Sequence, residues 1–213
     1  MIRAPLTILI PAAGASSRMR GADKLLEPVG LQPMLRHQVV LARAVCSTVY
    51  VTLRPEDAAR RAVVADLDVT ILAILDAATG MAASIRAGAA AAKSGGLMIL
   101  PADMPDLTSA DLQVLIDIFD QLPTRIIRAT AHDDTPGHPV IFPADCLTDL
   151  SMITGDVGAR AVLQAHQARI TLIALPDQHA TTDLDSPEDW AAWRAIRAVQ
   201  VLRQATESKN AFE

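Results

Sequence analysis

Residues 6–24 read LTILIPAAGASSRMRGADK, and this stretch decides the fold. The first five residues form an apolar run of strand length, which Pro11 ends. The residues that follow are small or polar and include two cations, Arg18 and Lys24, as expected of a loop. We therefore predict a buried strand and an accessible loop, because ligands of open α/β sheets bind beyond the carboxyl ends of the strands.

Beyond this stretch, apolar runs alternate with segments of helical character. The predicted strands span residues 6–10, 48–53, 69–74, 97–100, 125–131, 140–142 and 170–174. The predicted helices span residues 33–45, 56–66, 81–93, 109–121, 157–167 and 187–204. This alternation predicts an α/β protein: a three-layer α/β/α domain with a mostly parallel, Rossmann-like sheet. We expect one domain over residues 1–206 and a frayed tail over 207–213.

Composition limits the classes of function. The 213-residue chain has 19 basic and 24 acidic residues and a formal net charge of -5 at pH 7, whereas nucleic-acid-binding proteins usually have a basic excess. The apolar runs are much shorter than the roughly 20 residues of a membrane span. Cys46 and Cys146 lack zinc-ligand or redox spacing and are expected to be buried thiols. These features predict a cytoplasmic protein that binds neither nucleic acid nor membrane.

The loop after the first strand has the composition of an anion site. Ala12, Ala13 and Gly14 allow a ligand to approach the backbone closely and to accept hydrogen bonds from its N–H groups. Arg18 and Lys24 supply positive charge for a triphosphate. The loop matches neither the GxGxxG pattern nor the P-loop, in which lysine directly follows glycine. On composition alone, the alternative is an ordinary loop with surface charges.

Two later segments place carboxylates at predicted strand ends. Asp103 follows the apolar run 97–100, where a carboxylate needs a cation or hydrogen bonds to compensate its burial. Asp183 and Asp185 precede the helix start signal at residues 186–189. Oxygen ligands from two strand ends can together hold Mg²⁺. The alternative is that Asp103 caps a turn and that the other acids stand before a helix N-terminus, where acids are common.

These segments resemble the motifs of one family. Residues 12–26 closely resemble the nucleotide-binding signature of the molybdenum cofactor nucleotidyltransferases. Further similar segments lie at residues 80–88, 103–105, 137–140, 155–160 and 183–189. The sequence of residues 12–26 is nearest to the cytidylyltransferase branch, and residues 137–140 and 155–160 resemble acceptor-side motifs of that branch. Pro11, Arg20 and Ala102 depart from the family pattern. The resemblance implies a fold of the nucleotide-diphospho-sugar transferase type.

The resemblance also implies roles for individual residues. The nucleotide-binding residues would be Ala12, Ala13, Gly14, Ser16, Arg18, Lys24, Met81 and Ser84. Arg18, Lys24 and Asp103 would be catalytic, and Asp103 and Asp185, supported by Asp183, would hold Mg²⁺, with Mn²⁺ as an alternative ion. His138, Asp156 and Arg160 would contact the acceptor. The alternatives are a buried histidine before a strand, a helix N-cap and a surface arginine.

The reaction that the resemblance implies is transfer of CMP from CTP to the phosphate of the molybdenum cofactor, with release of pyrophosphate. The methyl group of Ala13 narrows the slot for the base and favours a pyrimidine by about 1–3 kcal/mol. Open alternatives are guanylyl transfer from GTP to the same cofactor, transfer to a sugar or polyol phosphate, and a non-catalytic nucleotide-binding accessory protein. A molybdoenzyme or its chaperone stays open as a protein partner.

Overall fold

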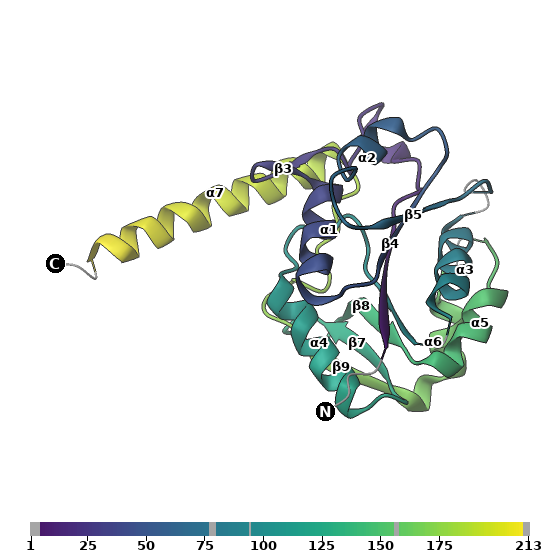
Figure 1. Ribbon diagram of the computed structural model, residues 1–213. Helices are drawn as coiled ribbons and strands as arrows, with labels where there is room; N and C mark the ends of the chain where they lie inside the picture. Colours follow the sequence, from purple (N-terminus) through teal and green to yellow (C-terminus); the bar gives the residue numbers. More distant parts are fainter. Residues whose placement is uncertain (1–4, 77–79, 94, 156–157, 211–213) are drawn as a thin grey trace.

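The sheet of this protein is mostly parallel, as Figure 1 shows. The computed structural model describes the backbone of residues 5–76, 80–93, 95–155 and 158–210, and side chains up to residue 200. The strand order is β5-β4-β1-β6-β8-β7-β9, and only β8 is antiparallel to its neighbours among these described strands. The bounds are β1 (Leu6–Pro11), β4 (Val49–Leu53), β5 (Thr70–Ala73), β6 (Gly96–Ile99), β7 (Ile126–Thr130), β8 (Pro136–Phe142) and β9 (Ile170–Ala174). A separate short ribbon pairs β2 (Pro28–Val29) with β3 (Gln32–Pro33).

Helices cover both faces of the sheet (Figure 1). One face carries α1 (Met34–Val45) and α4 (Ser109–Gln121), and the other carries α3 (Met81–Ala92), α5 (Leu147–Met152) and α6 (Arg160–Ala165). The short helix α2 (Ala58–Ala62) follows β4, and the long helix α7 (Pro187–Asn210) projects from the body. These layers confirm the expected α/β class. Within the described residues, no helix combines the length and apolar character that a membrane crossing requires.

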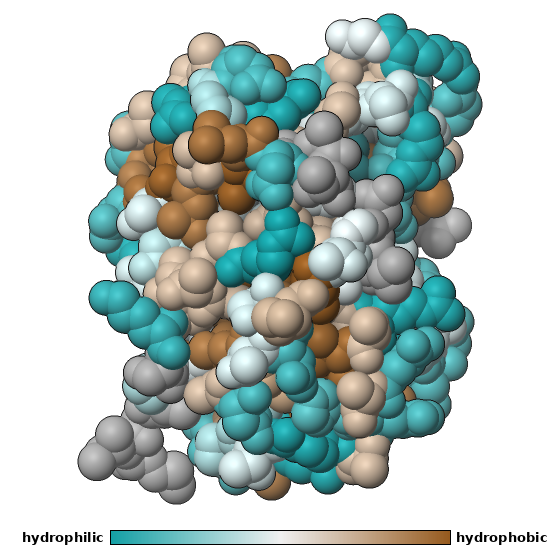
Figure 2. Space-filling model, turned by 90° about the vertical axis from the view of Figure 1, so that its right-hand side faces the viewer, coloured by the Kyte–Doolittle hydropathy of each residue, from teal (hydrophilic) through white to brown (hydrophobic). Residues whose placement is uncertain are grey.

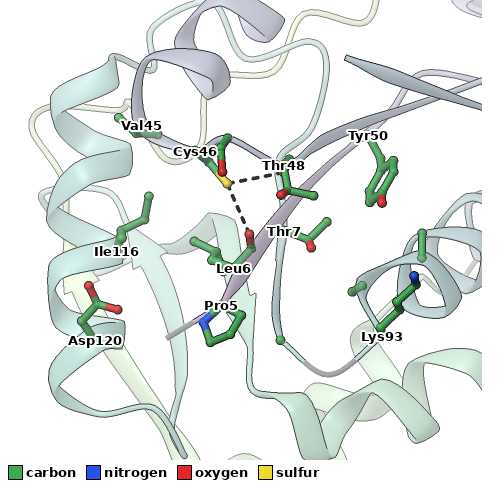
Figure 3. Close-up of a pocket in the computed structure, with 14 residues that line it drawn as sticks. Pro5, Leu6, Thr7, Val45, Cys46, Thr48, Tyr50, Lys93, Ile116 and Asp120 are labelled. Carbon is green, nitrogen blue, oxygen red and sulfur yellow. Dashed lines mark hydrogen bonds between the residues drawn. The ribbon is translucent and has the colours of Figure 1, made fainter. Parts of the chain in front are cut away.

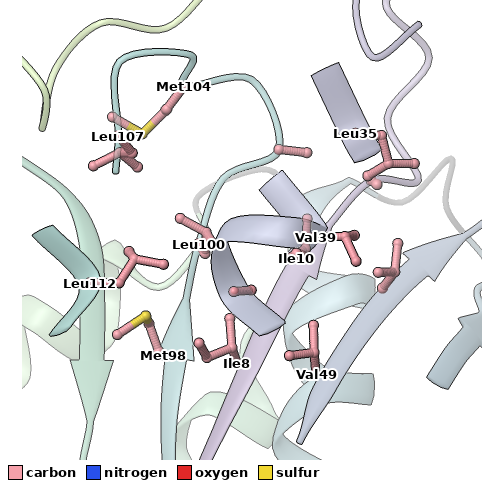
Figure 4. Packing of buried hydrophobic residues seen from close by; sticks show 14 of the residues in the cluster. Ile8, Ile10, Leu35, Val39, Val49, Met98, Leu100, Met104, Leu107 and Leu112 are labelled. Carbon is pink, nitrogen blue, oxygen red and sulfur yellow. The ribbon is translucent and has the colours of Figure 1, made fainter. Parts of the chain in front are cut away.

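The central strands are buried on both faces, which explains their uninterrupted apolar sequences. Ile8 and Ile10 of β1 and Met98 of β6 pack beneath α1 and α4, where Figure 4 shows them together with Val39 and Leu112. The intervening strand residues, Leu9, Leu97 and Ile99, pack on the opposite face with α3 and α5. The alternating side chains therefore fill two cores, and the sheet between them holds the strand ends in place.

Most predicted elements lie within two residues of their observed bounds, and four differ by more. The strand predicted for 140–142 begins four residues earlier, at Pro136, which pairs with Thr130 of β7. The helix predicted for 56–66 is reduced to Ala58–Ala62, after which the backbone turns so that Val64 enters the core. The helix predicted for 157–167 begins at Arg160, because Gly158 has a left-handed φ of 59°. Helix α7 continues past the predicted end to Asn210, since no glycine or proline stops it. The antiparallel direction of β8 follows from its short connection to β7.

Two tryptophans fix the start of α7 against the body. Trp190 is only 1% exposed and belongs to the core beneath α1 and α4. Trp193 donates a hydrogen bond from Nε1 to Asp106 Oδ1 at 2.7 Å. Ser186 caps the helix through a reciprocal pair of hydrogen bonds with Asp189. The segment before α7 is therefore held next to the turn that follows β6.

Gly137 packs so closely against the backbone of Ala180 that a side chain at this position should destabilise the fold. A Cβ atom on Gly137 would lie 1.9 Å from the Ala180 carbonyl oxygen, which accepts a hydrogen bond from the His138 N–H at 2.8 Å. We expect Gly137→Ala to lower the free energy of unfolding by about 1–3 kcal/mol in urea denaturation. Gly14→Ala is the matched control, since its Cβ would meet nothing within 4 Å. Equal unfolding midpoints for the two variants would contradict this account.

Candidate functional site

Three segments distant in sequence meet at the carboxyl edge of the parallel strands. The first loop (residues 12–24) follows β1, Asp103 follows β6, and Asp185 immediately precedes the cap of α7. The N–H of Leu184 donates a hydrogen bond to the carbonyl oxygen of Asp103 at 3.1 Å, which joins the last two segments directly. The structure therefore brings the two predicted carboxylates together, but only Asp103 lies at a strand end, whereas Asp185 lies before the first turn of α7.

The charged cluster, defined as Arg18, Lys24, Asp103 and Asp185, lies where these segments meet. The ammonium group of Lys24 contacts the carboxylate of Asp103 and also lies 2.7 Å from Asp185 Oδ1. Arg18 approaches the other oxygen of Asp185 at 2.8 Å. The side chains of Lys24, Asp103 and Asp185 are 17%, 17% and 18% exposed, whereas that of Arg18 is 70% exposed. One partly buried cation thus bridges two carboxylates, and an exposed cation stands at the rim.

Electrostatic coupling in this cluster is strong because its charges are partly buried. Burial disfavours the charge of Lys24, but the carboxylates of Asp103 and Asp185 outweigh this effect and raise the pKa of its ammonium group. Burial and the negative charges of Asp103 and Asp185 raise the pKa of the neighbouring Asp183. The site therefore concentrates negative charge that requires a cation.

The first cavity opens beside the charged cluster and has a volume of about 630 Å³. Six of the eight predicted nucleotide-binding residues line it: Ala12, Ala13, Gly14, Lys24, Met81 and Ser84. Asp103, Ser17 and His138 also contribute to its walls. Ser16 and Arg18 are not among its described lining residues. Ser16 instead donates a hydrogen bond to Asp23 at 3.2 Å, and Arg18 pairs with Asp185.

The second cavity, with a volume of about 710 Å³, adjoins the first. Met81, Ile99 and His138 line both cavities. The second cavity also exposes the predicted acceptor residue Arg160 and a second cation, Arg128 of β7. Asp156, the remaining predicted acceptor residue, lies outside the described residues. Two ligand groups bound in these cavities would therefore meet near His138.

The surface over this region mixes polar and apolar character. Figure 2 shows the face that carries α3, α5 and α6, with hydrophobic areas among hydrophilic side chains. Met81 at the start of α3 is 53% exposed and stands between the two cavities. An apolar contact beside several cations suits a ligand that has both a flat ring and phosphate groups.

Sequence reasoning missed three residues that shape the site. Arg60 of α2 is buried and donates hydrogen bonds to the first loop. In the sequence it is one of two adjacent arginines, a pattern that is equally typical of a solvent-exposed helix face. Thr52 of β4 accepts a hydrogen bond from the Ala12 N–H at 3.2 Å and donates one to Ser84 at 3.0 Å. Arg128 is the single charged residue of β7, and a lone charge within a strand was a signal that the sequence did offer.

The donor set fits a hard divalent cation. Asp103 and Asp185 present carboxylate oxygens to one shared positive group, the ammonium of Lys24, which stands in for the charge of a metal ion. No group of three or more His, Cys, Asp or Glu side chains suited to a metal occurs among the described residues. A cation held by these two aspartates would therefore take further oxygens from a phosphorylated ligand and water.

Another cavity, of about 740 Å³, lies at the opposite edge of the sheet (Figure 3). It is lined by the beginnings of β1 and β4, including Leu6, Thr48 and Tyr50, together with Cys46. The Sγ atom of Cys46 lies 3.3 and 3.4 Å from the carbonyl oxygens of Leu6 and Thr48, and its single proton can be donated to either of them. Burial raises the pKa of this thiol. Cys46 is therefore a poor nucleophile, and the candidate site is at the other edge.

The fold and site together define an α/β protein suited to phosphorylated ligands at the carboxyl edge of its sheet. Residues 8–170 match the family model described as the MobA-like NTP transferase domain, and the chain belongs to this family. This membership confirms the family-level resemblance of the sequence motifs.

Two curated relatives are named for the same kind of activity. A probable molybdenum cofactor guanylyltransferase from Rhodopirellula baltica is 29% identical over 156 residues, covering 70% of this chain and 73% of that protein. A molybdenum cofactor guanylyltransferase from Pseudomonas paraeruginosa is 37% identical over 122 residues, covering 57% of this chain and 60% of that protein. Both names specify guanylyl transfer, whereas the sequence motifs favoured the cytidylyl branch.

A solved structure shares the fold over nearly its whole length. Rv0371c from Mycobacterium tuberculosis H37Rv is 24% identical, with a TM-score of 0.76 over 89% of this chain and 97% of that chain. A complex of the same protein with manganese matches with a TM-score of 0.71 and 23% identity over 88% of this chain and 97% of that chain. At this level of identity the likeness concerns the fold.

His138 supplies a prediction about protonation. Burial, reinforced by the positive charge of Arg128, lowers the pKa of its imidazole below 6.5 despite the opposing effect of Asp103. We expect an NMR titration to show His138 mostly neutral at pH 6.5, where a free histidine is about half protonated. Arg128→Met should raise the pKa but leave it below 6.5, because burial is the larger cause. A wild-type value at or above 6.5 would contradict this electrostatic account.

Proposed function

We propose that this protein is a divalent-metal-dependent nucleotidyltransferase that transfers a nucleoside monophosphate from an NTP to the phosphate of the molybdenum cofactor. The observation that carries the proposal is the charged cluster at the edge of a cavity lined by the first loop. Paired carboxylates, a bridging lysine and exposed backbone amides suit the binding of a metal–triphosphate complex. The names of the two curated relatives support the choice of acceptor.

In the proposed reaction, an oxygen of the acceptor phosphate attacks the α-phosphorus in line. The new P–O bond forms as the bond between the α-phosphorus and the bridging oxygen breaks, and its electron pair leaves with pyrophosphate. The attacking oxygen is already an anion, so the reaction needs no general base. Arg18 and Lys24 neutralise the β- and γ-phosphates and the leaving group. Catalysis then depends on orientation and on reduced repulsion between anions.

Asp103 and Asp185 would hold the divalent cation. When bound, that cation supplies positive charge at the α-phosphate. Lys24 shares these carboxylates and also lines the first cavity. Its ammonium group is therefore free to exchange a carboxylate partner for a phosphate when a second cation takes its place. Mg²⁺ and Mn²⁺ both suit these oxygen donors, and the manganese complex of Rv0371c supports testing both.

The second cavity is the proposed acceptor pocket. Arg128 and Arg160 give it two cations for an anionic acceptor, and His138 joins it to the first cavity. Burial lowers the pKa of the His138 imidazole, which favours the neutral ring, and a neutral ring can accept or donate a hydrogen bond without adding to the local charge. Asp156 stays a predicted acceptor residue.

GTP and CTP are the two candidate donors, and the curated relatives favour GTP. The argument for CTP relied partly on the Ala13 methyl group narrowing the slot for the base. Ala13 is only 5% exposed and packs in an apolar cluster with Ile74 and Ala83. This packing weakens the steric preference for a pyrimidine. The motif at residues 155–160 still favours the cytidylyl branch, so CTP is the second candidate.

A donor and metal panel tests the proposal most directly. We expect pyrophosphate release that requires the molybdenum cofactor and Mg²⁺ or Mn²⁺, is strongest with GTP among GTP, CTP, ATP and UTP, and is abolished by EDTA. A preference for CTP would restore the cytidylyl assignment. Turnover with a sugar or polyol phosphate in place of the cofactor would reassign the acceptor. Nucleotide binding without any turnover would favour an accessory protein that serves a molybdoenzyme.

Substitutions in the charged cluster test the site assignment. Asp103→Ala or Lys24→Ala should lower kcat at least about a hundredfold, the scale of losing one charge-stabilising group. The control is Lys93→Ala, which removes an exposed lysine at the opposite edge of the sheet and should leave kcat unchanged. Near-normal turnover in either cluster variant would exclude its residue from the catalytic site.

A further inference from the structure

Arg60 is a buried arginine whose hydrogen bonds all go to the first loop or its neighbouring acids. The residue is only 2% exposed. Its Nη1 donates to the carbonyl oxygens of Ala12 at 2.6 Å and Gly14 at 2.7 Å. Its Nε and Nη2 donate to the two carboxylate oxygens of Asp23 at 2.7 and 2.8 Å, and Nη2 also donates to Ser16 Oγ at 3.0 Å. A side chain this costly to bury requires such complete pairing.

These bonds determine where the loop amides point. In a planar trans peptide, the carbonyl oxygen and the following N–H point in opposite directions. Because the oxygens of Ala12 and Gly14 face Arg60, the N–H groups of Ala13 and Ala15 face away from it. Both alanines line the first cavity. Within the described residues, neither N–H donates a loop hydrogen bond, so both are available to a ligand.

The positive charge of Arg60 is neutralised by Asp23 inside the protein. Asp23 pairs with the guanidinium in a bidentate geometry, and this pairing, acting against burial, lowers the pKa of the Asp23 carboxyl group. Asp23 Oδ1 also accepts hydrogen bonds from the Leu25 N–H at 3.0 Å and from Ser16 Oγ at 3.2 Å. The Arg60–Asp23 pair therefore fixes the backbone on both sides of Lys24 without placing its own charge in the cavity.

We propose that Arg60 is a positioning residue for the nucleotide: it holds the first loop so that the Ala13 and Ala15 amides donate hydrogen bonds to acceptor atoms of the bound base or sugar. This inference rests on the proposed nucleotide-binding function. Lysine cannot reproduce the role fully, because a single ammonium group lacks the planar fork that reaches two carbonyls and a carboxylate together.

The test compares nucleotide binding by wild type, Arg60→Met, Arg60→Lys and the control Arg61→Met. Arg61 is the next residue of the same helix and is not buried. Calorimetry with GTP and with CTP, each with Mg²⁺ and no acceptor, gives the dissociation constants. We expect Arg60→Met to raise Kd about tenfold or more, Arg60→Lys to raise it less, and Arg61→Met to leave it unchanged. With acceptor present, Arg60→Met should raise KM more than it lowers kcat.

Amide NMR spectra separate positioning from a purely structural role. In the ¹⁵N-labelled wild-type protein, nucleotide should shift the Ala13 and Ala15 resonances, and Arg60→Met should reduce these shifts at saturating nucleotide. Near-ultraviolet circular dichroism checks the fold of each variant, and Arg60→Lys decides the question if Arg60→Met does not fold.

Four outcomes are decisive. A wild type that binds no NTP overturns the proposed function and this inference with it. A wild type that binds, alongside folded Arg60 variants with unchanged Kd, overturns only the role of Arg60. Bound nucleotide that leaves both alanine amides unshifted also overturns that role. Weaker binding in the Arg60 variants with diminished amide shifts supports it.

Discussion

The ion bridge from Lys24 to Asp103 and Asp185 is the constraint on which the candidate site depends. Its members come from the beginning, middle and end of the described chain, so it closes only when the whole sheet is assembled. Two partly buried carboxylates that contact the same ammonium group would repel each other without a cation. The geometry therefore requires positive charge at this point at all times, from Lys24 alone or from Lys24 together with a bound metal ion.

The surrounding fold makes that bridge possible. Strands β1 and β6 are direct neighbours and end at the same edge, which brings Lys24 and Asp103 together. Asp185 is positioned in a different way, because it does not follow a strand. The burial of Trp190 and the hydrogen bond from Leu184 to Asp103 hold its segment in place. A hydrophobic contact on α7 thus supports an electrostatic one at the site.

Sequence patterns were sufficient for features that depend on local order and on parallel topology. The run 6–10 had to be a buried strand, and Asp103, which follows the parallel strand β6, had to lie at the same edge as the first loop. The position of Asp185 could not be derived in this way, because it follows no strand. The role of Arg60 was not predictable, because an Arg-Arg pair on a short helix does not reveal which side chain faces inward. The burial of Ala13 was equally hidden, since its partners Ile74 and Ala83 come from distant elements. Such features depend on tertiary packing.

The contrast between Arg18 and Arg60 explains why the residue at position 13 is a weak marker of the donor base. The side chain of Arg18 is 70% exposed and pairs with Asp185 at the rim, whereas the side chain of Arg60 is 3% exposed and holds the loop backbone from inside the protein. If Arg60 sets the direction of the Ala13 and Ala15 amides, the loop offers the same donors whether residue 13 carries a methyl group or not. Discrimination between bases must then come from other residues that line the first cavity, such as Met81 at the start of α3.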